Sequence, residues 1–114
     1  MQLSQDAMLL RIFFGERDRF EGKRLYDVIV QKARELHLAG ATVLRGPMGY
    51  GRNSRVHRAN LFEISEDLPI VIEIVDSPAN INLFLPELEK MMSSGLATLE
   101  KVRVIRYGDG PAAA

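Results

Sequence analysis

Residues 68–78 read LPIVIEIVDSP and carry the clearest structural signal in the chain. Successive side chains in this segment alternate between two faces, as they do in a β-strand. One face carries Ile70, Ile72 and Ile74, and the other carries Val71, Glu73 and Val75. Asp76 or Ser77 can then cap a helix, because their side-chain oxygens accept bonds from free N–H groups and Pro78 suits a first helical turn. The segment therefore predicts a strand over Leu68–Val75 that leads directly into a helix.

The same strand-then-helix order occurs earlier in the chain. Ala7 to Phe14 is a nearly continuous apolar run that ends at Gly15, a pattern typical of a strand covered on both faces. A charged loop over residues 16–23 precedes apolar residues at helical spacing, and Gly40 is placed to end that helix. Residues 41–45 then predict a second strand. The helical stripe consists of Leu25, Ile29, Ala33 and Leu36.

The second helix is predicted to contain Pro86, which should bend it, and to close at Gly95. Val102 to Tyr107 is predicted as the last strand. The apolar stripe of this helix consists of Ile81, Phe84, Leu85, Leu88 and Met92. The element order is then βαββαβ, which predicts an α+β, ferredoxin-like fold: a four-stranded antiparallel sheet with both helices on one face.

Length and composition limit the class of protein. A chain of 114 residues with 46% hydrophobic residues predicts one domain over residues 1–109, with a disordered tail over 110–114. Fifteen basic and fifteen acidic residues give no global basic field, so nucleic-acid binding is not expected. The absence of cysteine suits a reducing compartment. No signal peptide and no apolar run of the roughly 18 residues of a membrane span are recognised, so we expect a cytoplasmic protein without membrane insertion.

The face of the predicted sheet that the helices leave open is unusually apolar. Besides Ala7, it should carry Leu9, Arg11, Phe13, Val71, Glu73 and Val75. Such a patch on a small domain usually marks an interface, and packing against copies of the chain would bury it around a symmetry axis. Arg11 and Glu73 lie on neighbouring strands and could pair across the sheet. The alternative is a face that simply stays half-exposed.

A glycine-rich and basic segment follows the second strand. Glycines let backbone N–H groups approach an anion, and arginines supply planar charged donors for phosphate or carboxylate. The segment is therefore a candidate phosphate cradle, and the alternative is a flexible, solvated basic hairpin. The residues concerned are Arg45, Gly46, Gly49, Tyr50, Gly51, Arg52, Ser54, Arg55, His57 and Arg58.

Patterns for catalysis and metal binding are weak. Two histidines, His37 and His57, stand twenty residues apart without cysteine and make no metal-ligand spacing. His57 is interpreted as a surface residue, and His37 as a favourable charge late in the first helix. Ser54 lies near His57 in sequence, but no nucleophile elbow surrounds it. We therefore expect no enzyme.

Three segments together resemble a known family. They are residues 40–51, GATVLRGPMGYG, residues 65–76, SEDLPIVIEIVD, and residues 85–88, LPEL. They resemble the uncharacterised PII-like proteins of prokaryotes grouped as domain-of-unknown-function family 190, over nearly residues 7–107. The resemblance implies a ferredoxin-like fold and a PII-like homotrimer.

The wider family of nitrogen regulatory PII proteins binds adenine nucleotides between subunits and reports occupancy through a mobile loop. By this resemblance, Gly49-Tyr50-Gly51-Arg52 is similar to the base of that loop, and Lys101 to a phosphate-contacting basic residue that opens the last strand. The family's second nucleotide loop carries Gly-Asp-Gly. Here residues 98–100 replace it and leave Gly95 as the nearby glycine, and Arg103 and Arg106 are out of register with the family's paired C-terminal arginines. Gly95 and Arg103 are nevertheless candidate ligand-binding residues, together with Lys101.

The resulting hypothesis is a PII-like ligand-sensing regulator without an essential cofactor. It would bind ATP, ADP or AMP between subunits and signal through the basic hairpin to a partner. The resemblance implies a membrane transporter or channel as that partner, because members of this branch are often encoded beside fluoride-export channels. One alternative is a metal- or anion-binding trimer of the metal-tolerance type. Another is a small phosphohydrolase, whose phosphate loop would follow the first strand, where residues 15–19 read GERDR.

Overall fold

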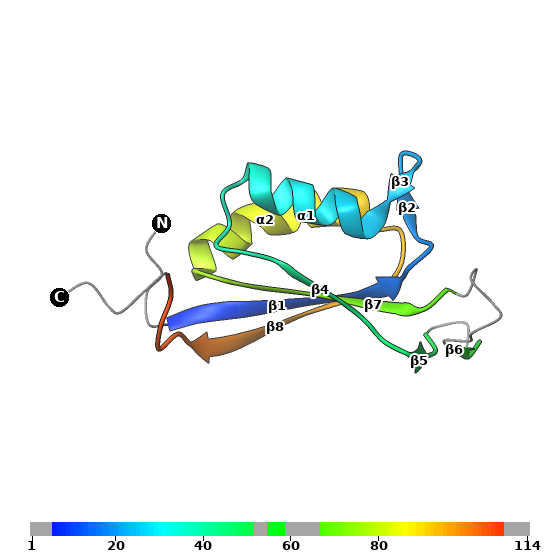
Figure 1. The fold of residues 1–114 in the computed structure, drawn as a ribbon. Coiled ribbons are helices and arrows are strands. Elements are labelled where there is room, and N and C mark those ends of the chain that lie inside the picture. Colours follow the sequence, from blue (N-terminus) through cyan, green and yellow to red (C-terminus); the bar gives the residue numbers. More distant parts are fainter. Residues whose placement is uncertain (1–5, 52–54, 59–66, 109–114) are drawn as a thin grey trace.

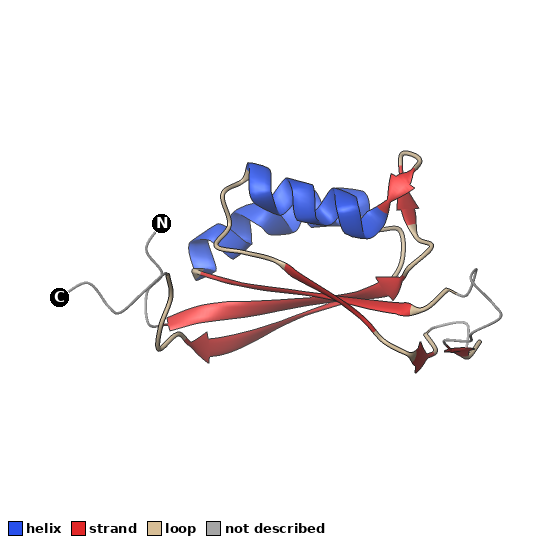
Figure 2. Cartoon of the chain, viewed as in Figure 1, coloured by secondary structure: helices blue, strands red, loops and turns tan. Residues whose placement is uncertain are grey.

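A computed structural model of the chain describes residues 6–51, 55–58 and 67–108. Two helices lie on one face of a four-stranded antiparallel sheet with strand order β4-β7-β1-β8 (Figures 1 and 2). The predicted ferredoxin-like α+β fold is therefore confirmed. The elements of these two layers are β1 (Asp6–Gly15), α1 (Leu25–Glu35), β4 (Thr42–Arg45), β7 (Pro69–Asp76), α2 (Pro78–Met91) and β8 (Leu96–Arg103).

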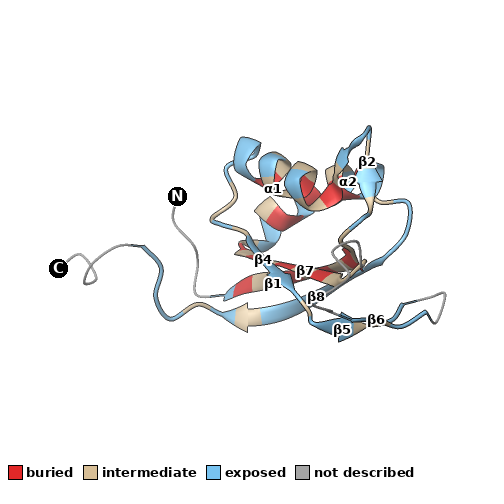
Figure 3. Cartoon of the chain, turned by 45° about the vertical axis from the view of Figure 1, so that its right-hand side comes forward, coloured by how far each residue is buried: buried red, intermediate tan, exposed pale blue. Residues whose placement is uncertain are grey.

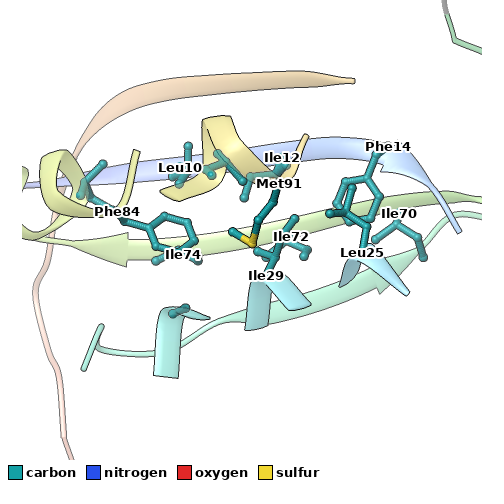
Figure 4. Close-up of a cluster of buried hydrophobic side chains, with 13 residues drawn as sticks. Leu10, Ile12, Phe14, Leu25, Ile29, Ile70, Ile72, Ile74, Phe84 and Met91 are labelled. Carbon is teal, nitrogen blue, oxygen red and sulfur yellow. The ribbon is translucent and has the colours of Figure 1, made fainter. Parts of the chain in front are cut away.

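The core lies between the helices and the sheet (Figure 4). Alternate residues of β1 and β7 point into it, as the sequence alternation predicts, and one stripe of each helix covers them. Close packing of these side chains supplies the main driving force for folding. Its buried members are Leu10, Ile12, Phe14, Leu25, Ile29, Ala33, Ile70, Ile72, Ile74, Ile81, Phe84, Leu88 and Met91.

Helix α1 ends earlier than predicted, and Gly40 does not end it. His37 adopts a left-handed conformation, with φ of 59°, two residues after Glu35. The N–H of His37 donates to the carbonyl of Arg34 at 3.1 Å, and the N–H of Leu38 donates to that of Ala33 at 3.0 Å. These two bonds form the Schellman motif that glycine usually completes. The prediction that Gly40 ends the helix is therefore wrong, because the chain has already left the helix before Gly40.

Helix α2 begins as predicted. The Ser77 hydroxyl accepts from the N–H of Asn80 at 3.2 Å, and Pro78 occupies the first turn. Asp76 is fully buried, and its carboxylate accepts from the N–H groups of Ala39 and Ser77 and from the Asn80 amide, at 2.7, 2.6 and 3.0 Å. The end of β7, the start of α2 and the loop before β4 are thereby held together.

Two small hairpins add to the βαββαβ pattern. Strands β2 (Arg19–Phe20) and β3 (Lys23–Arg24) pair within the predicted charged loop, around Glu21 and Gly22 with φ of 51° and 80°. Strands β5 (Met48–Gly49) and β6 (His57–Arg58) pair beyond the end of β4. The second hairpin lies in the glycine-rich and basic segment for which the sequence offers a hairpin. The sequence also predicts an extended segment over residues 61–64, which lie outside the described residues.

The last strand was predicted in the wrong place. Strand β8 spans Leu96–Arg103, six residues before the predicted start, and Gly95 introduces it instead of ending α2. Residues 104–107 have left the sheet, and the Tyr107 hydroxyl donates to the Ala39 carbonyl at 3.1 Å. Because β8 is exposed on both faces along most of its length, its sequence shows no apolar alternation (Figure 3).

The open face of the sheet carries the predicted pair. Arg11 and Glu73 are direct partners in the β1–β7 ladder, and the Arg11 Nε donates to Glu73 Oε2 at 2.9 Å. Ladder register adds Leu44 and Leu96, both exposed, to this open face. Ala7 was predicted to be on the patch but is only 3% exposed, so it adds almost nothing to the exposed apolar surface.

Candidate functional site

Ladder register brings two glycine-containing segments to the same end of the sheet. Arg45 pairs with Ile70 and Ile70 with Phe14, while the adjacent Phe13 pairs with Leu96. The hairpin root, residues 45–51, therefore leaves edge strand β4 at the end where the Gly95 turn, residues 92–95, enters edge strand β8 (Figure 1). Two strands lie between them, so about 14 Å of sheet separates the two segments within one chain.

The glycines of the hairpin root serve close packing. A Cβ on Gly46 would lie 2.9 Å from the Pro69 ring, and one on Gly49 would lie 3.0 Å from it. The Gly46 N–H donates to the Pro69 carbonyl at 2.8 Å, so it is already bonded and is not offered to an anion. The predicted backbone cradle therefore loses this donor, and Gly46 positions the root over β7.

Side chains of the hairpin lie mostly at the surface. Met48, Tyr50 and Val56 are exposed apolar residues, with Tyr50 70% exposed. His57 is half-buried in β6 and Arg58 is exposed beside it. Gly51 has open space around its Cα. Arg52 and Ser54, which the sequence placed in the same site, lie outside the described residues.

Arg45 points to the turn after β1. Its guanidinium lies 2.5 Å from the Glu16 carboxylate, which comes from the other side of β7. The Arg45 side chain is 56% exposed, whereas that of Glu16 is only 19% exposed. Sequence reasoning missed Glu16, because nothing local marks a contact 29 residues away.

The turn after β1 does not offer a phosphate loop. The N–H groups of Glu16, Arg17 and Asp18 donate to Leu68 O, Asp67 Oδ1 and Gly15 O at 2.8, 2.7 and 3.0 Å. All three N–H groups are already bonded within the chain, so none of them is available to hold a phosphate. Burial raises the pKa of Asp18, the bond from the Gly15 N–H opposes this, and the charge of Asp67 adds to it.

The Gly95 turn forms one side of a small groove. Gly95 has φ of 112°, and a Cβ there would lie 2.6 Å from the Phe13 carbonyl oxygen, so glycine is required. The groove of about 260 Å³ is lined by Leu88, Glu89, Met92, Ser93, Ser94, Gly95 and Ala97. Its walls suit an apolar ring with a polar edge, whereas Glu89 is unfavourable to phosphate.

The two basic residues of β8 lie away from this groove. Lys101 pairs with Met8 and Arg103 with Asp6, toward the opposite end of the sheet. Lys101 is the sixth residue of the strand, about 20 Å along it from Gly95. It was matched to a basic residue that opens the last strand, and Leu96 holds that position instead.

Within residues 6–51, 55–58 and 67–108, no three His, Asp or Glu side chains converge as a metal site. Neither described helix is long and apolar enough to cross a bilayer.

Comparison with known proteins identifies relatives along almost the whole chain. A UPF0166 protein of Aquifex aeolicus is 44% identical over 97 residues, which cover 85% of this chain and 91% of that protein. A UPF0166 protein of Methanocaldococcus jannaschii is 37% identical over 101 residues, covering 88% of this chain and 93% of that protein.

Two solved structures share the fold. One is a protein of Thermus thermophilus described as a PII-like signalling protein, with a TM-score of 0.64 and 19% identity, over 92% of this chain and 94% of that chain. The other is CPII of Thiomonas intermedia bound to ADP and bicarbonate, with a TM-score of 0.62 and 16% identity, over 89% of this chain and 90% of that chain.

Family membership follows from the match over the folded part of the chain. Residues 7–104 match the family DUF190, described as uncharacterised ACR. This range begins in β1 and ends just after β8. The chain therefore belongs to the DUF190 family and has the fold of PII-like signalling proteins.

Proposed function

We propose that this protein is a ligand-sensing regulator that assembles as a homotrimer and binds an adenine nucleotide between subunits. The observation that carries the proposal is the position of the hairpin root and the Gly95 turn on opposite edges of one sheet, at the same end. In a cyclic assembly the root of one subunit can meet the turn of the next, although the two stay apart within a chain.

The groove at the Gly95 turn supports a site shared between subunits. Its volume of about 260 Å³ lies below the roughly 300–1,000 Å³ of pockets that enclose small ligands. It has apolar walls and two serine hydroxyls but no basic side chain. We assign it to the base and ribose, so the positive charge for phosphate comes from another segment. The basic hairpin, which includes Arg45, Arg52 and Arg58, can supply this positive charge.

The open face of the sheet supports the assembly. It is rich in apolar side chains whose exposure to water is unfavourable, among them Phe13, Leu44 and Leu96. Burying each large apolar side chain contributes about 1.5–3 kcal/mol, so a shared interface over this face would be stable. Three copies around an axis would bury it without leaving an open surface.

The ligand class is taken from a structural neighbour. CPII, which has the same fold, is bound to ADP and bicarbonate in one structure and to ADP, AMP and bicarbonate in another. In the present protein the nucleotide would act as a signal. Its binding would order the hairpin, whose exposed Met48, Tyr50 and Val56 could then contact a partner, with a membrane transporter or channel as the candidate.

Calorimetry and thermal unfolding with ADP, AMP and ATP test the proposal. A nucleotide at 100 times its dissociation constant should stabilise the folded state by about 2.7 kcal/mol. Arg52→Ala should weaken binding, Lys101→Ala tests the basic end of β8, and Lys23→Ala is the matched control on the β2–β3 hairpin. Stabilisation by divalent metals alone, with none by nucleotides, would contradict the proposal.

A further inference from the structure

The turn after β1, residues 15–18, contacts both ends of the hairpin excursion, which is the segment between β4 and β7. The outgoing arm is residues 45–51, and the returning arm is residues 67–68. Arg45, on the outgoing arm, pairs with the carboxylate of Glu16 at 2.5 Å. On the returning arm, Asp67 accepts from the Arg17 N–H at 2.7 Å and the Leu68 carbonyl accepts from the Glu16 N–H at 2.8 Å. The outgoing arm is thus held through a side-chain ion pair, whereas the returning arm is held by bonds to the backbone of the turn. The ion pair is the contact that another charged group can replace.

The Glu16 carboxylate occupies the position on Arg45 that an anionic ligand would take. Its side chain is only 19% exposed, so its charge is poorly hydrated and depends on Arg45 for compensation. Arg45 is 56% exposed and remains open to a ligand from the solvent side. From Arg45 to Phe62 the sequence contains four arginines and no acidic residue, and the carboxylate that pairs with Arg45 comes from the turn after β1.

We infer that Glu16 competes with an anionic ligand for Arg45, and so sets both the affinity of the nucleotide site and the release of the hairpin root. The inference rests on the proposed function and adds its regulation. A phosphate group that takes Arg45 must displace Glu16. The outgoing arm then loses its contact with the turn and keeps the bond from the Gly46 N–H to the Pro69 carbonyl, while Asp67 and Leu68 continue to hold the returning arm.

Competition of this kind lowers the apparent affinity. Only the fraction of molecules in which Arg45 has left Glu16 is competent to bind, and the apparent dissociation constant rises in inverse proportion to that fraction. Removing the charge of Glu16 should therefore tighten binding. It should also loosen the root, which the Gly46 N–H reports through its bond to the Pro69 carbonyl.

The experiment is a titration of ADP into wild type, Glu16→Gln, Arg45→Ala, the double variant and Asp18→Asn. Asp18 lies in the same turn and carries the same charge, but the Arg45–Glu16 pair stays intact when it is changed, so it is the matched control. Glu16→Gln should bind ADP about three- to tenfold more tightly than wild type, and Asp18→Asn within about twofold of it. In the Arg45→Ala background, Glu16→Gln should give no gain, since the two effects couple through one contact.

Amide exchange of Gly46 without ligand gives the second readout. It should be faster in Glu16→Gln than in Asp18→Asn, independent of nucleotide. An equal gain in affinity in both variants would mean a general charge effect and would overturn the competition. So would unchanged affinity in Glu16→Gln while wild type binds ADP, a result that leaves the proposed function standing. If wild type and every variant fail to bind ADP, the proposed function falls and the inference falls with it.

Discussion

Arg11 lies directly opposite Glu73 in the β1–β7 ladder, and its Nε donates to Glu73 Oε2 at 2.9 Å on the open face of the sheet. The two side chains are 42% and 33% exposed in a single chain. An assembly that covers this face removes water from the pair. Each charge then depends on the other, because an unpaired buried charge is far more costly than a buried pair.

Single truncations of this pair should therefore weaken the assembly. Arg11→Ala or Glu73→Ala leaves one charge without its partner, and we expect a loss of about 2–4 kcal/mol in association. The double variant Arg11→Met with Glu73→Leu keeps the volume and removes both charges, so it should assemble as well as wild type. Sedimentation equilibrium measures the mass against the 12.8 kDa of one chain. A wild-type protein that sediments as a monomer would contradict the account of this face.

Gly95 should tolerate no side chain. Its φ of 112° is strained for any other residue, and a Cβ would lie 2.6 Å from the Phe13 carbonyl oxygen. We expect Gly95→Ala to lower the free energy of unfolding by about 2–4 kcal/mol in a urea titration. Gly51→Ala is the control, since its Cβ would meet open space. Equal effects of the two changes would show that the Gly95 turn is not as described.

His37→Gly should stabilise the protein. His37 closes the Schellman motif with φ of 59°, a conformation that costs a residue with a Cβ about 1 kcal/mol and glycine almost nothing. After allowing for the greater freedom of glycine in the unfolded chain, the net gain should be about 0.5 kcal/mol. Gly40→Ala should also be neutral or stabilising, because a Cβ there would have no atom within 4 Å. A loss of stability in His37→Gly would mean that the imidazole makes a contact that matters.

Much of the fold follows from local patterns. The β7–α2 unit is predictable because alternation, a serine cap and a proline in the first turn all agree over eleven residues. Strand β8 is not, because both of its faces are exposed and no apolar period marks it. The end of α1 was missed because a histidine takes the position that glycine usually takes. The β2–β3 hairpin is not predictable either, because its turn residues Glu21-Gly22 lack the Asn-Gly or Asp-Gly pair that marks a tight hairpin.

The candidate site is less predictable than the fold. The glycines and arginines of the hairpin were recognisable as a group, but the bond from the Gly46 N–H to Pro69 depends on how β4 and β7 align. The contacts of Glu16 with Arg45 and of Arg17 with Asp67 join residues far apart in sequence. A single sequence contains no information on such pairs beyond their opposite charges or donor and acceptor types.

Stability should depend on pH through Asp18. Burial raises the pKa of its carboxyl above the ordinary value of 3.8, so the folded state holds the proton more tightly than the unfolded state. The favourable contribution is complete below pH 3.8 and is lost as the pH rises through the raised pKa. Asp18→Asn should therefore be more stable than wild type at pH 7, by less than about 1 kcal/mol, and should gain nothing at about pH 3. Urea titrations at the two pH values measure this, with Glu89→Gln as an exposed control, and an equal gain at both would contradict it.

The most direct test of a nucleotide site between subunits is complementation of two defective variants. Arg52→Ala removes a charge from the hairpin, and Ser94→Trp fills the groove at the Gly95 turn, so each homotrimer should bind ADP much more weakly than wild type. Trimers formed by refolding an equal mixture should regain about one quarter of the wild-type sites, since each site then takes its two halves from different chains at random. Calorimetric titration of the mixture with ADP counts the sites. Recovery near that fraction is the result the account predicts, and no recovery in a mixture of exchanging subunits would contradict it, because a site within one chain always keeps its defect.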